Sequence, residues 1–283
     1  MPNSLHSEVT DVIRRALEED IGSGDVTTAA CVPADRQARG YFIARENLVL
    51  AGTKLLAPIY EMRGGVDELT LHHMDGDHLH EGVRVAEVLG NARTLLECER
   101  VALNFLQRLS GIATLAHEYA SQVEGTPCKV LDTRKTTPGL RRLEKAAAAA
   151  GGVVNHRMGL FDAILIKNNH IAAAGGVRQA IENARQSGLP HSSQAIEIEV
   201  RTLDELHEAL DARADHLLLD NLSPMQAAEW VRLINHRAKV ELSGGITLDS
   251  LRNYAETGAD FVSAGAITHS ARAVDLSFRL ELL

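Results

Sequence analysis

The chain has 283 residues, of which 45% are hydrophobic and 24% charged, so it can bury a full core and is long enough for two domains. Its formal net charge of −9 argues against nucleic-acid binding, because nucleic-acid binders neutralise phosphates with a basic face. Any anion site must then be a local cluster of cations. Three widely spaced cysteines, no 18-residue apolar stretch and no secretion signal predict a cytoplasmic protein with reduced thiols and no membrane span.

The first 110 residues predict an N-terminal α/β layer of sandwich-like character. Apolar residues at helical spacing between Leu5 and Leu17 predict an amphipathic helix that ends near Gly22. Short β-type runs over 39–51 and 69–96, separated by turn signals, predict a small antiparallel sheet. A long helix is expected from about Leu95 through Leu109, with apolar spacing that can continue to Val123, and it would link two domains.

A group of metal-binding residue types lies in the antiparallel region. Strand alternation divides these side chains between two faces, and no helical H-x-x-x-H pair holds them together. We therefore expect no metal held by the protein at this group, which comprises His72, His73, Asp75, Asp77, His78 and His80.

Residues 111–273 alternate between strand and helix patterns, which predicts β/α units. Thr202 with Glu205 and Ser223 with Gln226 form capping boxes that begin two of the helices. The compact repeat favours an incomplete β/α barrel of about six or seven strands over a doubly wound sheet. The apolar alternation within 274–283 predicts a final strand that returns to the N-terminal layer. The six clear strands are expected near 129–132, 163–167, 195–200, 216–220, 240–243 and 261–264.

The segment 131–141 places an Arg134-Lys135 pair where a strand turns into a helix. Thr137 is the expected N-cap of that helix, and Pro138 is its expected first residue. Basic side chains at such a turn point toward the edge of a parallel sheet where small anionic substrates bind. The alternative is a pair of solvated surface cations.

Polar residues cluster at the ends of the other predicted strands as well. Because the carboxyl ends of barrel strands face one side, residues far apart in sequence converge there. The expected cations are Arg134, Lys135, His156, Arg157, Lys167 and His170, and the expected anions are Glu199 and Asp220.

Two glycine turns follow consecutive predicted strands. Glycine lets backbone N–H groups turn toward an anion without obstruction by a side chain. Turns after the last two barrel strands commonly hold a substrate phosphate, although a single turn of this kind usually serves only geometry. We expect the phosphate site at Ser243, Gly244 and Gly245 together with Ser263, Ala264 and Gly265.

Glu199 and Asp220 each end an apolar strand. A single carboxylate at that place more often caps a helix or pairs with a neighbour. Two of them on adjacent strands beside six cations suit a reaction in which positive charge develops on a sugar ring.

These motifs together resemble the quinolinate phosphoribosyltransferase family, also called carboxylating nicotinate-nucleotide pyrophosphorylases. The resemblance covers nearly the whole chain. It rests on the segments 18–28, 132–140, 155–157, 166–170, 219–221 and 243–246.

The resemblance implies transfer of a phosphoribosyl group from phosphoribosyl pyrophosphate to quinolinate, with loss of carbon dioxide, in NAD synthesis. It implies that Mg²⁺ arrives with the pyrophosphate. It further implies quinolinate ligands at Arg134, His156, Arg157 and Lys167, with Thr133 and His170 beside them. Lys135 would lie near the reacting groups, Glu199 and Asp220 would contact the ribose, and Arg100 would reach the partner's pocket in a homodimer.

Three alternatives remain open at this stage. A phosphoribosyltransferase of the same fold could take another acceptor, such as nicotinate or the acceptor of a relative encoded beside molybdate transporters. A β/α-barrel lyase or isomerase acting on a sugar phosphate would share the glycine turns. A non-catalytic anion-binding protein would not require Glu199 and Asp220 among the cations.

Overall fold

The computed structural model describes residues 2–189 and 195–283. The chain folds into two compact units, each built from segments that are discontinuous in the sequence. The first unit comprises Met1–His117, Thr137–Gly152 and Ser270–Leu283, and the second comprises Glu118–Thr136 and Val153–His269.

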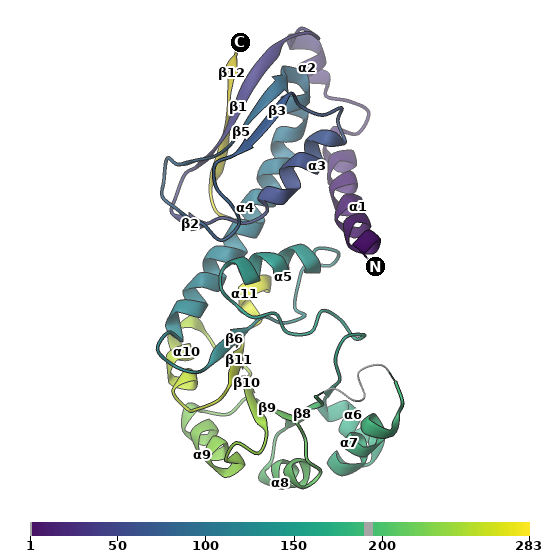
Figure 1. Cartoon of the computed structure of the whole chain (residues 1–283), viewed down its shortest axis with the longest axis vertical. Coiled ribbons are helices and arrows are strands. Elements are labelled where there is room, and N and C mark those ends of the chain that lie inside the picture. Colours follow the sequence, from purple (N-terminus) through teal and green to yellow (C-terminus); the bar gives the residue numbers. More distant parts are fainter. Residues whose placement is uncertain (1, 190–194) are drawn as a thin grey trace. The chain divides into compact units, whose positions relative to one another are not determined.

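The first unit contains a four-stranded antiparallel sheet in the order β12-β1-β5-β3 (Figure 1). Its strands are β1 (Gln37–Ala44), β3 (Glu68–Leu71), β5 (Arg84–Asn91) and β12 (Leu276–Leu282), and a separate two-stranded pair joins β2 (Leu48–Val49) to β4 (His78–Leu79). The C-terminal strand β12 pairs with β1 so that Phe278 lies opposite Phe42, with ring centroids 4.9 Å apart. This contact needs Gly40, because a Cβ there would lie 2.1 Å from the Phe278 ring.

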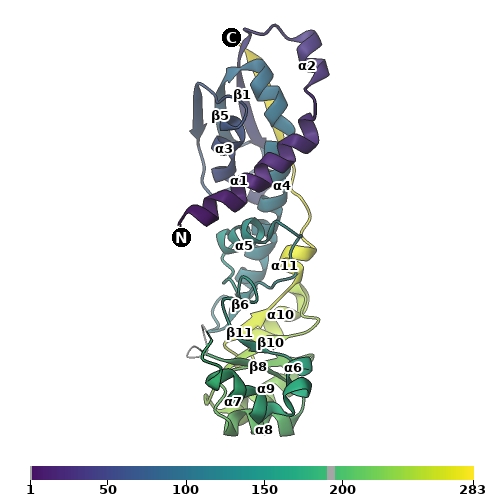
Figure 2. The same ribbon diagram turned by 90° about the vertical axis from the view of Figure 1, so that its right-hand side faces the viewer.

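Helices complete the first unit. The predicted amphipathic helix is α1 (Pro2–Ile21), and it lies beside α3 (Leu56–Glu61) in both views (Figures 1 and 2). The predicted long helix is α4 (Ala92–Gln122), which is longer than the 95–109 core of the prediction. The remaining helices are α2 (Val26–Cys31), the short 3-10 helix η1 (Thr53–Leu55) and α5 (Arg141–Ala150).

Helix α5 begins later than the sequence predicts. Thr137 is not its N-cap and Pro138 is not its first residue, because Leu140 precedes the first turn and Gly139 adopts a left-handed φ of +81°. The Glu144 carboxylate contacts the turn that precedes the helix. It accepts hydrogen bonds from the Thr137 N–H at 3.0 Å and from the Thr137 hydroxyl at 2.7 Å.

The second unit contains six parallel strands in the order β6-β11-β10-β9-β8-β7. They are β6 (Lys129–Leu131), β7 (Leu165–Ile166), β8 (Glu197–Val200), β9 (His216–Asp220), β10 (Lys239–Ser243) and β11 (Phe261–Ser263). All six lie where the sequence predicts them. Within the described residues the sheet stays open between β6 and β7, which confirms an incomplete barrel.

Helices cover the outside of this curved sheet in Figure 1. The predicted capping boxes begin two of them, with Thr202 at the start of α8 (Leu203–Asp211) and Ser223 at the start of α9 (Pro224–Ile234). The others are α6 (Asn168–Ala174), α7 (Val177–Gln186), α10 (Leu248–Ala255) and α11 (Ala266–His269). Among the described helices none is long and apolar enough to cross a membrane.

Candidate active site

The parallel strands of the second unit bring their last residues to one edge of the sheet, which we call the carboxyl edge. Polar residues stand at the end of every strand there. Asp132 follows β6, Lys167 follows β7, Glu199 is the next-to-last residue of β8, and Asp220, Ser243 and Ser263 end β9, β10 and β11. The sequence prediction that these residues share one edge is confirmed.

Glu199 lies at the centre of a charged cluster at this edge. Its side chain is 5% exposed, and its Oε1 accepts a hydrogen bond from Arg201 Nε at 2.9 Å and forms an ion pair with Arg201 Nη2 at 2.6 Å. Its Oε2 lies 3.9 Å from Lys167 Nζ, and Arg201 Nη2 lies 3.9 Å from Asp220 Oδ2. The two predicted catalytic carboxylates therefore belong to one cluster, which two cations partly neutralise.

Asp220 is held by the turn that follows β10. Asn221 Nδ2 donates to Asp220 Oδ2 at 2.8 Å, and the Asn221 N–H donates to the Ser243 carbonyl at 2.9 Å. Gly244 permits this approach, because a Cβ there would lie 2.3 Å from Asn221 Oδ1, and its φ is +97°. The predicted phosphate turn thus also orients a predicted catalytic carboxylate.

Lys135 packs against the turn after β11. A Cβ on Gly265 would lie 2.8 Å from Lys135 Cδ, and the Thr268 hydroxyl donates to the Lys135 carbonyl at 2.8 Å. The predicted catalytic lysine and the second predicted phosphate turn are therefore neighbours. Thr133 supports this loop, because its hydroxyl oxygen accepts from the Lys135 N–H at 3.1 Å.

His156 lies above two buried carboxyl groups. Its Nε2 lies 3.2 Å from Glu197 Oε2 and 3.4 Å from Glu241 Oε2, and the two glutamates are 7% and 4% exposed. The His156 N–H donates to Asp132 Oδ1 at 2.8 Å, which fixes the loop after the buried end of β6. Glu197 and Glu241 also hydrogen-bond to each other.

Burial and hydrogen bonds together shift the pKa values of the three groups in this cluster. Burial opposes a charged ring, but hydrogen bonds to Glu197 and Glu241 outweigh it and raise the pKa of His156 to about 10. Burial raises the pKa of Glu197. Burial also acts to raise the pKa of Glu241, but the hydrogen bond from His156 prevails and lowers it. Glu197 is therefore the partner that holds a proton more readily, and Glu241 is the one that ionises more readily.

One contact favours the neutral ring instead. The Arg157 N–H approaches His156 Nδ1 at 2.6 Å, which requires a lone pair on Nδ1. Such a neutral hydrogen bond contributes about 1 kcal/mol. In this structure the ring therefore carries its proton on Nε2, and Nδ1 accepts the Arg157 N–H.

The same ring disfavours a metal at this place. Nε2, Glu197 and Glu241 have the spacing of a metal site, since their ligand atoms lie within 4.8 Å of one another. Nε2 carries a proton in both the charged ring and the neutral ring that accepts at Nδ1. A protonated nitrogen has no lone pair for a metal.

Arg157 and Arg134 supply further positive charge near His156. Burial and the charge of Arg134 lower the pKa of Arg157, which shows that the two guanidinium groups are close enough to repel each other. Arg157 Nη1 donates to the Ala163 carbonyl at 3.1 Å. Cations held close together in a partly buried place attract an anion strongly.

Some predicted ligands already have partners in the protein. The Ser263 hydroxyl hydrogen-bonds to Glu241, and the Ala264 N–H donates to the Leu131 carbonyl at 3.1 Å. His170 Nδ1 accepts from the Lys167 N–H at 2.9 Å, so this exposed ring caps α6. Gly245, by contrast, has open space around its Cβ position.

Arg100 belongs to the first unit and lies on α4. Its side chain is 56% exposed, and its Nη2 lies 3.9 Å from Glu99 Oε1. Its predicted role in a partner's pocket remains a prediction.

Glu197, Glu241 and Arg201 were not predicted as site residues from the sequence. A signal for the two glutamates was present, because both are charged residues inside apolar strands. Strand alternation places Glu197 on the same face as Glu199. Arg201 lies between the end of β8 and the N-cap of α8, where the sequence indicated only a helix start.

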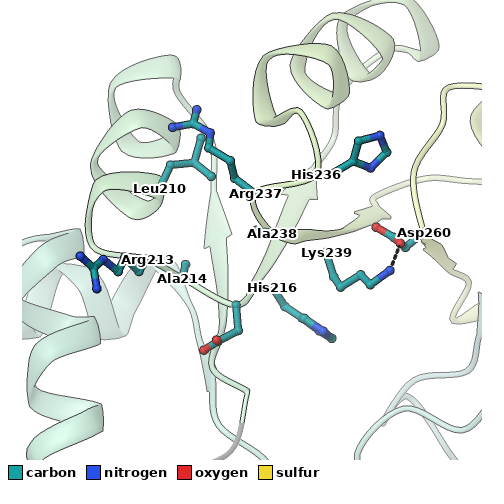
Figure 3. A pocket seen from close by; sticks show the side chains of 10 residues that line it. Leu210, Arg213, Ala214, His216, His236, Arg237, Ala238, Lys239 and Asp260 are labelled. Carbon is teal, nitrogen blue, oxygen red and sulfur yellow. Dashed lines mark hydrogen bonds and ion pairs between the residues drawn. The ribbon is translucent and has the colours of Figure 1, made fainter.

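A separate pocket lies at the opposite, amino-terminal edge of the sheet (Figure 3). His216 and Lys239 begin β9 and β10, and Lys239 Nζ contacts Asp260 Oδ1 at 2.5 Å. Arg237 donates from Nε to the Ile234 carbonyl at 3.3 Å. No predicted site residue lines this pocket, so it is distinct from the cluster at the carboxyl edge.

Comparisons with known proteins agree with this architecture. Residues 25–110 match the family domain described as quinolinate phosphoribosyl transferase, N-terminal domain, and residues 112–279 match its C-terminal domain. The probable carboxylating nicotinate-nucleotide pyrophosphorylase of Bacillus subtilis is 40% identical over 277 residues, covering 98% of this chain and 95% of that protein.

Two solved structures are similar over nearly their whole length. NadC from Streptococcus pyogenes is 40% identical with a TM-score of 0.92, covering 100% of this chain and 98% of that one. The nicotinate-nucleotide pyrophosphorylase from Francisella tularensis is 37% identical with a TM-score of 0.90, and the match covers 97% of this chain and 96% of that one.

Proposed function

Since the chain belongs to the quinolinate phosphoribosyltransferase family, we propose that it transfers a phosphoribosyl group from phosphoribosyl pyrophosphate to the ring nitrogen of quinolinate. The products are nicotinate mononucleotide, pyrophosphate and carbon dioxide, and the reaction supplies NAD biosynthesis. The observation that carries this proposal is the single charged cluster at the carboxyl edge, in which Glu199 lies between Arg201 and Lys167 and close to Asp220.

The cations of this edge suit a substrate with two carboxylates. Arg134, Arg157, His156 and Lys167 would bind them, because charge-assisted hydrogen bonds to carboxylates are the strong ones. An acidic protein has to concentrate such cations locally.

The two carboxylates of Glu199 and Asp220 suit a reaction at the ribose of the substrate. Loss of pyrophosphate leaves positive charge on the ribose ring, and Glu199 and Asp220 would stabilise that charge and contact the ribose hydroxyls. Asn221 and Arg201 would keep the two carboxylates in position. Lys135 would lie beside the reacting groups, and the turns at 243–245 and 263–265 would receive the 5′-phosphate.

Decarboxylation follows from the chemistry of the product ring. Once the ring nitrogen carries the ribose it is cationic, and this charge stabilises the carbanion left when the adjacent carboxylate departs as carbon dioxide. A proton from water or a neighbouring acid then completes the ring carbon. The protein mainly positions the substrates and neutralises their charge.

Magnesium would enter with the substrate, bound to the pyrophosphate oxygens, and would neutralise the leaving group. A homodimer would complete the site, with Arg100 donated across the interface to the partner's pocket. The exposed Arg100 side chain supports this role. We propose a cytoplasmic enzyme that binds neither nucleic acid nor membranes, in keeping with the charge of −9.

A turnover assay tests the acceptor. Purified protein with phosphoribosyl pyrophosphate and Mg²⁺ should convert quinolinate faster than nicotinate and release pyrophosphate and carbon dioxide in equal amounts. Faster use of nicotinate would assign the chain to another acceptor. Absence of pyrophosphate release with either acceptor would favour a sugar-phosphate lyase or isomerase.

Substitutions test the roles. Glu199→Ala should retain quinolinate binding and slow turnover, and unchanged turnover would refute its role. Mixed dimers that combine Arg100→Ala subunits with subunits altered at Lys135 should regain part of the activity, because one intact pocket forms. Absence of complementation would argue against a shared pocket.

A further inference from the structure

Asp162 and the loop that it closes have no part in the reaction as described so far. The loop follows Arg157, a predicted carboxylate ligand, and ends at Ala163, shortly before β7 begins. We propose that Asp162 is a positioning residue that shapes this loop, so that the Arg157 guanidinium group meets a carboxylate of the substrate. This inference rests on the proposed function and concerns how the same site holds its dicarboxylate.

The segment that carries Arg157 connects the two edge strands of the open sheet. At its start, Val154 forms a parallel bridge to Leu131 of β6. At its end, beside β7, the Ile164 carbonyl accepts the Glu197 N–H at 3.2 Å. Both ends are therefore fixed to the sheet, whereas residues 157–163 belong to no helix or strand. The shape of this part has to come from other contacts.

Asp162 supplies two of these contacts. Its Oδ2 accepts the Met158 N–H at 2.6 Å, and its Oδ1 accepts the Gly159 N–H at 2.9 Å. Burial acts to raise the pKa of Asp162, but the hydrogen bonds from Gly159 and Met158 prevail and lower it. Hydrogen bonds to a charged acceptor are stronger than neutral ones. Both carboxylate oxygens thus hold the backbone directly after Arg157.

Arg157 itself reaches across the same loop. Its Nη1 donates to the Ala163 carbonyl at 3.1 Å, and its backbone N–H donates to His156 Nδ1 at 2.6 Å. The N–H groups on Nε and Nη2 can then bind a carboxylate in a bidentate manner. Their direction depends on where the Ala163 carbonyl lies, and Asp162 directly precedes that residue. A change in the loop therefore turns the guanidinium group.

The charge of Asp162 also acts on Arg157. Burial and the charge of Arg134 lower the pKa of Arg157, whereas Glu197 and Asp162 act in the opposite direction. Two guanidinium groups that share one dianionic ligand repel each other while the site is empty. Asp162 offsets part of this repulsion from a distance, because its own oxygens bind the backbone.

Burial of apolar side chains does not hold the loop in shape. Leu160 and Phe161 at its tip are 76% and 69% exposed. The Phe161 ring lies against Gly159, where a Cβ would be 2.5 Å from the ring. A loop with little buried apolar surface adds little to the stability of the core. Loss of the Asp162 contacts should therefore affect substrate binding more than folding.

Steady-state kinetics test this difference in wild type, Asp162→Asn and Asp162→Ala. The KM for quinolinate should rise about threefold in Asp162→Asn, which keeps one acceptor oxygen, and about tenfold in Asp162→Ala. The KM for phosphoribosyl pyrophosphate and the midpoint of urea unfolding should change much less. An equal rise in KM for both substrates would indicate a general loss of structure and would overturn the proposal.

A double-mutant cycle shows whether Asp162 acts through Arg157. Arg157→Lys keeps the charge but loses the planar, forked donor group. In that background Asp162→Asn should raise the KM for quinolinate by less than about twofold, because the group that it positions is gone. Full additivity of the two changes would contradict a role through Arg157.

Asp77→Asn is the matched control for loss of a carboxylate that caps a turn. Asp77 Oδ2 accepts the Met74 N–H at 2.9 Å in an exposed turn of the first unit. This variant should leave the KM for quinolinate unchanged. A rise equal to that in Asp162→Asn would show that the effect is not specific to the Arg157 loop.

Amide hydrogen exchange in wild-type protein covers the case in which the variants do not fold. The Met158 and Gly159 N–H groups should exchange more slowly than the exposed Leu160 N–H, and equal rates would overturn the proposal. A wild type that used nicotinate and not quinolinate would refute the proposed function alone, because the same KM comparison then applies to the nicotinate carboxylate. A wild type that used neither acceptor would refute both.

Discussion

Arg201 clamps Glu199 with two of its guanidinium nitrogens, Nε at 2.9 Å and Nη2 at 2.6 Å from the same carboxylate oxygen. Glu199 is almost fully buried, whereas the Arg201 side chain is 48% exposed. The arginine therefore reaches inward from the surface to hold a buried acid. Its second contact, 3.9 Å from Asp220 Oδ2, joins both predicted catalytic carboxylates to one cation.

Arg201→Gln should lower kcat about three- to tenfold and leave the KM for quinolinate nearly unchanged. Loss of a charge-assisted hydrogen bond costs about 1.5 kcal/mol or more when buried, and solvent reduces this value at a half-exposed group. The carboxylate of Glu199 then loses its fixed orientation toward the ribose. Steady-state kinetics with each substrate varied in turn measures the effect.

Arg232→Gln is the matched control, because Arg232 lies on α9 and donates only locally, from Nε to the Ala228 carbonyl at 3.1 Å. It should leave both kinetic constants unchanged. If Arg201→Gln kept wild-type kcat, Arg201 would be a surface ion pair without influence on the reaction.

Prediction from sequence worked best where a rule depends on strand geometry alone. The apolar run Leu217–Leu219 predicted a buried strand, and the rule that parallel strands end on one edge then placed Glu199 and Asp220 together. Both conclusions need only local patterns and the topology of β/α units.

The rest of the site depends on contacts that no local pattern encodes. Arg201 directly precedes a capping box, so its sequence neighbourhood indicated a helix start and nothing about a turn back to Glu199. Ser263 was expected to face a phosphate, but its hydroxyl contacts Glu241 because a strand residue of that register points into the barrel.

Helix α5 was mispredicted for a related reason. Thr137 and Pro138 have the composition of a helix start, and propensity alone favours that interpretation. The left-handed Gly139, the contact of Glu144 with Thr137 and its ion pair with the distant Arg108 instead make a separate turn. A contact between residues 36 positions apart overrode the local signal.

Gly244→Ala should damage both folding and activity. A Cβ at this position would lie 2.7 Å from the Asn221 backbone nitrogen, which cannot rotate away, and the φ of +97° is itself strained for alanine. We expect a loss of about 3 kcal/mol in the free energy of unfolding, combining left-handed strain and overpacking. Urea unfolding measures the loss, and a fall in kcat should accompany it because Asp220 moves with Asn221.

Gly245→Ala separates strain from collision. Its φ is +62°, but no atom lies within 4 Å of its Cβ position. The free energy of unfolding of this variant should fall by only about 1 kcal/mol, the cost of a left-handed backbone at alanine. Equal losses in the two variants would show that the contact with Asn221 is unimportant.

Glu144→Gln should destabilise the first unit. The carboxylate is 0% exposed and accepts from Arg108 Nη2 at 3.0 Å and from the Thr137 hydroxyl at 2.7 Å. Removing one charge of a buried pair leaves the other uncompensated, which costs about 3 to 5 kcal/mol when both partners are buried. Because Arg108 is 28% exposed, we expect a smaller loss, about 2 to 3 kcal/mol.

The exposed pair of Arg252 and Glu256 provides the comparison for that measurement. Its nitrogen and oxygen are 2.6 Å apart, yet the side chains are 45% and 56% exposed. Glu256→Gln should change the free energy of unfolding by about 0.5 kcal/mol or less. A similar value for Glu144→Gln would mean that burial adds nothing to its ion pair.

Thiol labelling should distinguish one cysteine from the other two. Cys31 is exposed, whereas Cys98 and Cys128 are buried, and burial raises the pKa of each buried thiol to about 12. Because the thiolate is the reactive form, native protein at pH 8 should react rapidly at one site and, after denaturation, at three.

Cys98 lies in the first unit and Cys128 in the second, so their slow labelling measures the opening of each unit separately. Mass spectrometry of the labelled peptides assigns the sites, and Glu144→Gln should accelerate Cys98 more than Cys128. Rapid modification of either buried cysteine in the wild type would contradict its position in the core.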